Sequence, residues 1–149
     1  MSDPGSIAGR ARVDESESVS LEMPASTEHL RLVRLLVSSF ATSHGADLND
    51  LEDLRLAADE VCVHAISATM TGDRLRITAA VQPEVDGGSM LVVRASVAED
   101  GDPGPLDELS SMVLDAATNA HGVDVEQGNV SVWFRRTVRS AGPVDHAVD

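Results

Sequence analysis

The chain has 149 residues, enough for one domain with a core of its own, and 42% of them are hydrophobic while only 2% are aromatic. Its 25 acidic residues outnumber the 11 basic ones, and the formal net charge of -14 disfavours direct binding to the phosphates of DNA or RNA. Cys62 is the only cysteine, which excludes an internal disulfide, and without a long apolar run we expect a cytoplasmic protein with no membrane span and no secretory leader.

The chain is predicted to open its folded part with a strand and a helix. Residues 19–23 alternate between apolar and polar side chains, as in a half-buried strand, and Pro24 ends the alternation. Ser26 or Thr27 then caps a helix that continues to about Ser43.

A second helix is predicted from about Asp50 to Ala68, with Asn49 as its cap. Apolar residues at helical spacing predict its buried side, which comprises Leu54, Ala58, Val61 and Ala65. Cys62 lies among them, so we interpret it as a small buried residue rather than a redox switch.

Two strands, Leu75–Val81 and Met90–Val97, are predicted to form a hairpin, because the segment between them contains Pro83 and two glycines. The next segment, Glu99–Pro105, is acidic and too rich in glycine and proline to continue a strand.

Asp107 is predicted to cap a third helix that runs to about His121. The apolar stripe expected to bury this helix comprises Leu106, Leu109, Val113, Ala116 and Ala120. Gly122 ends the helix, and strands Val123–Glu126 and Val130–Val138 follow, joined by a tight turn.

This order of elements predicts an α/β (α+β) fold. The order is a strand, two helices, two strands, a helix and two strands. A two-layer sandwich accommodates this order best, with a mixed, mainly antiparallel sheet that carries about three helices on one face. The domain is expected over residues 18–138. Residues 1–17 and 139–149 are poor in apolar side chains and are predicted to be flexible tails.

The most informative segment for function is DLRLAADEVCVHAI, which begins at Asp53. Glu60 and His64 lie four residues apart, so they share one face of the second helix and can reach into one cleft. Phosphate-binding loops, dinucleotide fingerprints, nucleophile elbows and zinc-binding helices are absent from the sequence. The five histidines are scattered, and we predict no metal site built by them.

With this helix and the element order, the chain from about Val19 to Val138 resembles the anti-sigma factor and serine-protein kinase family of the GHKL ATPase superfamily. The resemblance implies a helix with a glutamate that acts as or near the general base and, four residues later, an asparagine that helps to hold magnesium on ATP. Glu60 matches the first position. His64 departs from the second, and an imidazole replaces the oxygen ligand that magnesium prefers.

The resemblance implies two further nucleotide elements. Glu99 and Gly101 stand where the family has an adenine-binding DxGxG loop, although Pro103 removes a backbone donor there, and a solvated acidic turn is the other reading. The family's glycine-rich lid corresponds to residues 109–112, which contain no glycine. We therefore place Glu60 as the candidate catalytic residue and His64, Glu99 and Gly101 as candidate nucleotide-binding residues, with ATP and magnesium as cofactors only if the site is retained.

A partner surface is also implied, because the first strand and first helix form much of the dimer surface in the relatives. The apolar zone of the first helix is too broad for one buried stripe, which favours a homodimer. The alternative is that helix ends and loops of the same chain cover the additional apolar surface. The predicted surface comprises Val19, Leu21, Arg31, Leu32, Arg34 and Leu35.

Two hypotheses of different classes follow. The leading one is a binding protein, an anti-sigma factor that sequesters a sigma subunit of RNA polymerase and is captured by an anti-anti-sigma partner, with weak or no kinase chemistry. The alternative is an active serine-protein kinase that uses ATP and magnesium to phosphorylate that partner. A domain that keeps the fold but binds another protein or a small ligand is a third possibility.

Overall fold

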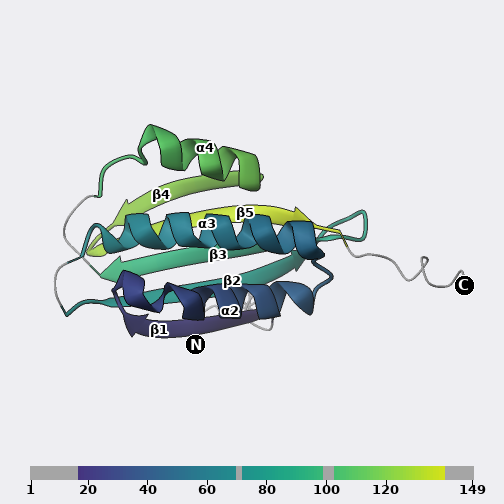
Figure 1. Ribbon diagram of the computed structural model, residues 1–149, viewed down its shortest axis with the longest axis horizontal. Helices are drawn as coiled ribbons and strands as arrows, with labels where there is room; N and C mark the ends of the chain where they lie inside the picture. Colours follow the sequence, from purple (N-terminus) through teal and green to yellow (C-terminus); the bar gives the residue numbers. More distant parts are fainter. Residues whose placement is uncertain (1–16, 70–71, 99–102, 140–149) are drawn as a thin grey trace, which may run out of the picture.

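The computed structural model describes residues 17–69, 72–98 and 103–139, and the predicted order of elements is confirmed (Figure 1). The elements are β1 (Ser18–Pro24), the 3-10 helix η1 (Thr27–His29), α2 (Leu30–Thr42), α3 (Leu48–Ile66), β2 (Arg74–Pro83), β3 (Ser89–Ala98), α4 (Glu108–Ala117), β4 (Ala120–Glu126) and β5 (Asn129–Val138). No helix among the described residues combines the length and apolarity that crossing a membrane requires.

The strands form one five-stranded sheet in the order β1-β2-β3-β5-β4. The sequence predicts a mixed, mainly antiparallel sheet, and each neighbouring pair of described strands is antiparallel. Figure 1 shows α2 over β1 and β2, α3 over the middle of the sheet and α4 beside β4, all on the same side. The predicted two-layer sandwich is therefore confirmed.

The core lies between the two layers. Alternate residues of each central strand face the helices and are fully or almost fully buried, as on Leu75–Val81 and Leu91–Val97. The residues between them point to the other side of the sheet, which no described helix covers. Within the described residues, the fold thus has a packed helix layer and one sheet face that no helix covers, which we call the open face.

The second helix begins earlier than predicted, since Asp47 and not Asn49 is its cap. The Asp47 carboxylate accepts from the Asp50 amide at 2.9 Å, and the Asp50 carboxylate accepts from the Asp47 amide at 3.0 Å. This reciprocal capping box satisfies two backbone donors at once, which a cap at Asn49 would leave unpaired. The predicted buried residues of this helix are confirmed at 0% exposure.

The third helix is shorter than predicted, and its buried stripe is shifted. It ends at Ala117, Thr118 is extended, and Ala120 already belongs to β4. Leu114 and Ala117, three residues apart, are the buried positions of this helix, whereas the predicted Leu109 is 70% exposed. The predicted extension to His121 is wrong because residues 120–126 form β4 and pair with β5. A helix that continued to His121 would leave the backbone groups of β5 opposite these residues without hydrogen-bond partners.

Arg136 lies on β5, and its side chain connects this strand to α3 and α4. Its guanidinium lies 2.8 Å from an Asp50 oxygen and 2.9 Å from an Asp53 oxygen at the start of α3, and it donates to the Ala117 carbonyl at the end of α4 at 3.0 Å. Burial alone would raise the pKa of Asp50, but hydrogen bonds from the Asp47 amide and from Arg136 outweigh burial and hold it below its usual value. Arg136 therefore fixes both helices to β5.

Gly122 of β4 lies against the indole of Trp133, its cross-strand partner on β5. A Cβ atom added at Gly122 would stand 2.7 Å from Cζ2 of that ring, closer than side-chain atoms can approach. Glycine at this position therefore allows the flat contact between the edge strand and the tryptophan.

Replacing Gly122 with alanine is expected to destabilise the protein by about 1–2 kcal/mol, because the ring must move, although alanine inside a strand is normally about 0.5–1 kcal/mol more favourable than glycine. Urea unfolding followed by circular dichroism measures the change. The matched double variant, G122A with W133L, should lose this penalty because the obstructing ring is gone. A single alanine variant as stable as the parent would contradict the packing described.

Candidate functional site

Glu60 and His64 lie one turn apart on the same face of α3, as predicted, and both are half-buried. His64 Nε2 is 2.9 Å from the carbonyl oxygen of Gly104, in the segment that leads to α4. Since a carbonyl oxygen only accepts, Nε2 carries the proton and donates it. His64 therefore joins α3 to this loop.

This hydrogen bond limits what His64 offers to a cation, because Nε2 carries its hydrogen toward Gly104 and has no lone pair for a metal. The other ring nitrogen, Nδ1, keeps a lone pair, but magnesium selects oxygen ligands in octahedral geometry. Glu60 is the one oxygen donor of the pair. The residue types at these two positions thus do not fit the magnesium ion of a working family site.

The N-terminus of α4 is filled by a carboxylate from this chain. Asp107 caps the helix and accepts from the Ser110 amide at 2.7 Å. The hydrogen bonds from Ser110, and to a smaller extent the neighbouring His64, hold the pKa of Asp107 below its usual value. A helix N-terminus normally attracts phosphate. Here Asp107 occupies the position and its negative charge repels a second anion.

The predicted lid, residues 109–112, forms the first turns of α4 as regular helix. Leu109 and Met112 expose 70% and 61% of their surface, so this segment presents apolar side chains to solvent rather than free amides. The predicted adenine-contacting residues, Glu99 and Gly101, lie outside the described residues. The structure therefore brings His64 to Gly104, which the sequence alone did not single out, and places it near Asp107, whose predicted role as the cap of this helix is confirmed.

Cys62 has the structural role predicted for it. It is buried on α3, and burial, assisted by the negative charge of Asp59, raises the pKa of its thiol far above the usual value. A thiol held in its neutral form is a poor nucleophile.

The predicted partner surface is only partly exposed. Val19, Leu32 and Leu35 expose 36%, 39% and 62% of their surface. Leu21 is half-buried against the core, Arg31 is exposed, and the Arg34 Nε lies 3.0 Å from an Asp59 oxygen on α3.

The two sides of α2 explain this division. Arg34 and Ser38, four residues apart, contact α3 through hydrogen bonds with Asp59 and Arg55. Leu32 lies two residues before Arg34 and therefore on the opposite side of α2, where 39% of its surface is exposed. Leu35 is also turned to solvent.

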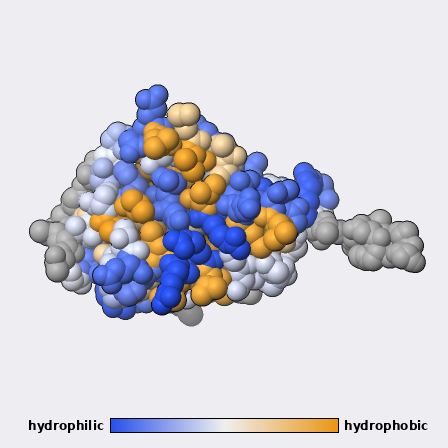
Figure 2. All heavy atoms as spheres, in the orientation of Figure 1, coloured by the Kyte–Doolittle hydropathy of each residue, from blue (hydrophilic) through white to orange (hydrophobic). Residues whose placement is uncertain are grey.

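Figure 2 shows the helix layer as separate apolar areas divided by charged side chains rather than one continuous apolar field. Besides the residues already named, the exposed large hydrophobics of α3 are Leu48, Leu56 and Val63. Such scattered exposure is compatible with protein contacts of moderate size and polar rims.

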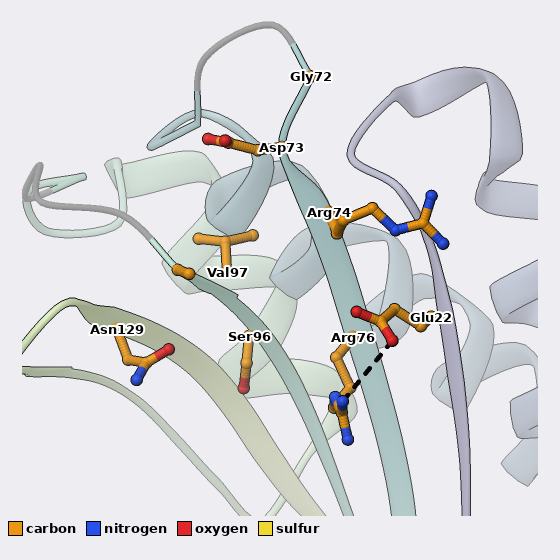
Figure 3. Close-up of a pocket in the computed structure, with 9 residues that line it drawn as sticks. Glu22, Gly72, Asp73, Arg74, Arg76, Ser96, Val97 and Asn129 are labelled. Carbon is orange, nitrogen blue, oxygen red and sulfur yellow. Dashed lines mark ion pairs between the residues drawn. The ribbon is translucent and has the colours of Figure 1, made fainter.

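A hollow that the sequence did not predict lies on the open side of the sheet, where β1 ends and β2 begins (Figure 3). Its walls include Arg74, Arg76, Ser96 and Asn129, and Arg76 is paired with Glu22 at 3.6 Å. The predicted strand began at Leu75 and left Arg74 out, whereas β2 begins at Arg74 and places it on the same polar face as Arg76, two residues later.

Comparison with known proteins places this geometry in a family. The histidine kinase-like ATPase domain family matches residues 23–126. The anti-sigma-F factor RsbW of Mycobacterium tuberculosis is 39% identical over 83 residues, which are 56% of this chain and 46% of that protein. The serine-protein kinases RsbW of Bacillus velezensis and Bacillus subtilis are 27% and 24% identical over 80% and 84% of this chain, and 72% and 76% of their own lengths.

Among solved structures, that of the RsbU and RsbW domains of a Mycobacterium tuberculosis protein matches 84% of this chain and 34% of that chain, with a TM-score of 0.56 and 20% identity. At this identity the similarity shows a common fold. The chain spans less than half the length of the matched Mycobacterium tuberculosis relatives.

Proposed function

Because the chain belongs to the histidine kinase-like ATPase domain family, matched over residues 23–126, we propose that it is an anti-sigma regulatory factor that works by binding and not by phosphoryl transfer. In this proposal it sequesters a sigma subunit of RNA polymerase and releases it when an anti-anti-sigma protein takes its place. The names of the relatives, anti-sigma-F factor and serine-protein kinase RsbW, support the choice of partners.

The observation that supports binding over catalysis is the hydrogen bond from His64 to Gly104. Phosphoryl transfer depends on a metal ion that neutralises the phosphates and on donors that position them. In this chain His64, at the position where the resemblance implies a metal ligand, donates a hydrogen bond to the Gly104 carbonyl, and Asp107 puts a negative charge at the helix end where phosphate would sit. Both features weaken the nucleotide site while leaving the fold intact.

We also propose a homodimer formed through β1 and α2. The outer edge of β1 pairs with no described strand, and Val19 on β1 and Leu32 on α2 are both exposed. A second copy packed along β1 and α2 would bury apolar surface of both side chains.

The second candidate function is a serine-protein kinase, favoured by Glu60, which keeps the position of the general base, and by the relatives named as kinases. It differs from the leading proposal in requiring bound ATP and a phosphorylated partner.

The proposal predicts a stable complex with a sigma factor and no phosphorylation of the antagonist. Size-exclusion chromatography of the full chain with each sigma factor of the host measures the first, and incubation with radiolabelled ATP, magnesium and the antagonist measures the second. The variant E60Q serves as the control, because it removes the general-base candidate and should behave as the parent does.

Failure to form a complex with any sigma factor would overturn the anti-sigma role. Phosphoserine in the antagonist, present with the parent chain and absent with E60Q, would establish the kinase instead. Calorimetry with ATP adds a third readout, since micromolar affinity that depends on magnesium would contradict a disabled site.

A further inference from the structure

The open face of the sheet carries a concentration of positive charge in an acidic protein. Alternate positions of β2, β3 and β5 point to this face, and its arginines are Arg74, Arg76, Arg94 and Arg135. Its carboxylates include Glu22 and Asp124, from the two edge strands. The formal net charge of the whole chain is -14, so most of its acidic residues lie outside this face.

The register of the strands arranges three of these arginines in a line. Arg76 is paired with Ser96, Thr78 with Arg94, and Val92 with Arg135. Each arginine therefore lies one strand further across the sheet and two residues further along it than the one before. With strands about 4.8 Å apart and about 3.4 Å per residue, successive positions on this diagonal are roughly 8 Å apart.

A hollow lies near each end of the arginine diagonal. The first, shown in Figure 3, is lined by Arg74, Arg76 and Asn129. The second is lined by Gln82, Val92, Arg94, Trp133 and Arg135, and the Arg135 guanidinium lies 5.5 Å from the centre of the indole. Between them the face carries small side chains such as Thr78, Ser96 and Ser131, so little stands above the backbone.

The ion pairs already present on this face are weak enough to be exchanged. Arg76 and Glu22 are 3.6 Å apart with 59% and 50% of their side chains exposed. Arg94 and Asp124 are 3.2 Å apart with 41% and 48% exposed. Exposed pairs of this kind contribute little to stability, so incoming carboxylates can replace the internal ones at small cost.

We propose that the open sheet face binds an acidic, extended segment of a partner protein, laid along the diagonal from Arg76 to Arg135. Alternate side chains of an extended peptide are roughly 7 Å apart on one side, close to the spacing of the arginines. Carboxylates at every second position meet Arg76, Arg94 and Arg135, and an apolar side chain beside them packs on Trp133.

A protein segment fits this face better than a nucleic acid does. A strand of nucleic acid carries a phosphate at every residue, and the negative charge of the rest of the domain repels such a polyanion. A short acidic segment brings only the few charges that the diagonal can neutralise. The proposal does not rest on the anti-sigma role, and it uses the side of the sheet opposite the helix layer.

Trp133 makes the test direct, because it is the only tryptophan and the chain has no tyrosine. A synthetic peptide of alternating glutamate and serine is titrated into the full chain while the emission of Trp133 is followed. We expect a saturable change in emission that weakens as salt is raised. The double variant R94Q with R135Q should bind at least about tenfold more weakly. The matched control R55Q removes an exposed arginine from α3 and should bind as the parent does.

Other results would overturn the proposal. A peptide of alternating lysine and serine that binds equally well would show that the charge of the arginines is not what is recognised. Single-stranded DNA that binds more tightly than the peptide would assign the face to nucleic acid. If removal of residues 140–149 alone reproduces the change in emission, the chain's own end occupies the face. If emission of the free protein depends on its concentration, a second copy does.

Discussion

Replacing Arg136 with methionine is expected to lower the free energy of unfolding by about 2–3 kcal/mol, between the effect of an exposed ion pair and that of a fully buried one. The Arg136 and Asp50 side chains are only 18% and 14% exposed, so the variant leaves a carboxylate that water reaches poorly. It also leaves the Ala117 carbonyl without this donor. Urea denaturation at neutral pH measures the loss.

The same contact predicts how stability depends on pH. The pKa of Asp50 is lowered in the folded state, so its contribution is fully present above the ordinary value of 3.8 and is lost as pH falls through the lowered value. Arg136→Met removes one of the groups that lower this pKa. The stability difference between the variant and the parent is therefore expected to shrink in acid, as the carboxyl becomes neutral in both.

Arg139, directly after the end of β5, provides a matched control. It forms an ion pair with Asp86 at a similar distance, 3.0 Å, but the two side chains are 66% and 56% exposed. Arg139→Met should therefore change the free energy of unfolding by less than about 0.5 kcal/mol. Equal losses in the two variants would contradict the importance given to burial of the Arg136 contact.

Replacing Leu32 with glutamate is expected to convert the proposed homodimer into a monomer, with dimer affinity reduced about a hundredfold or more. Leu32 is 39% exposed on the side of α2 turned away from α3, and a carboxylate buried there against a second copy would lose its hydration. Sedimentation velocity over a range of protein concentrations measures the change. The exposed position also means that the fold of each protomer should remain intact.

The control for this variant is Leu56→Glu on α3. Leu56 is 53% exposed, and thus similar to Leu32 in its contact with solvent, but it lies away from β1. Its substitution should leave the association unchanged. A parent chain that stays monomeric at every concentration would refute the dimer itself.

The sequence was sufficient for those features that depend on local periodicity. The alternation on β2 and β3 and the apolar stripe of α3 correspond directly to buried positions, because each element repeats its own period against one core. For α4 the periodicity was ambiguous, since Leu109, Val113 and Ala116 form a stripe as regular as the one through Leu114 and Ala117. Only the position of the sheet decides which stripe is buried.

Contacts of the candidate site between residues far apart in the chain could not be predicted from local periodicity. Glu60 and His64 were predicted to share one face of a helix, and the structure confirms this. That His64 donates to the Gly104 carbonyl follows from packing between α3 and a loop 40 residues further along the chain. Likewise, nothing in the local sequence relates Arg136 to Asp50, which are 86 residues apart.

The pairing of β1 with β2 has a consequence for the order of folding. Ser18 pairs with Ala80 and Met23 with Leu75, so α2 and α3 both lie within the loop that this pairing closes. The hairpins β2–β3 and β4–β5 close far shorter loops and lose less chain entropy in forming. β1 is synthesised before the other described strands. It is nevertheless expected to be the last of them to join the sheet, after α2 and α3 have docked.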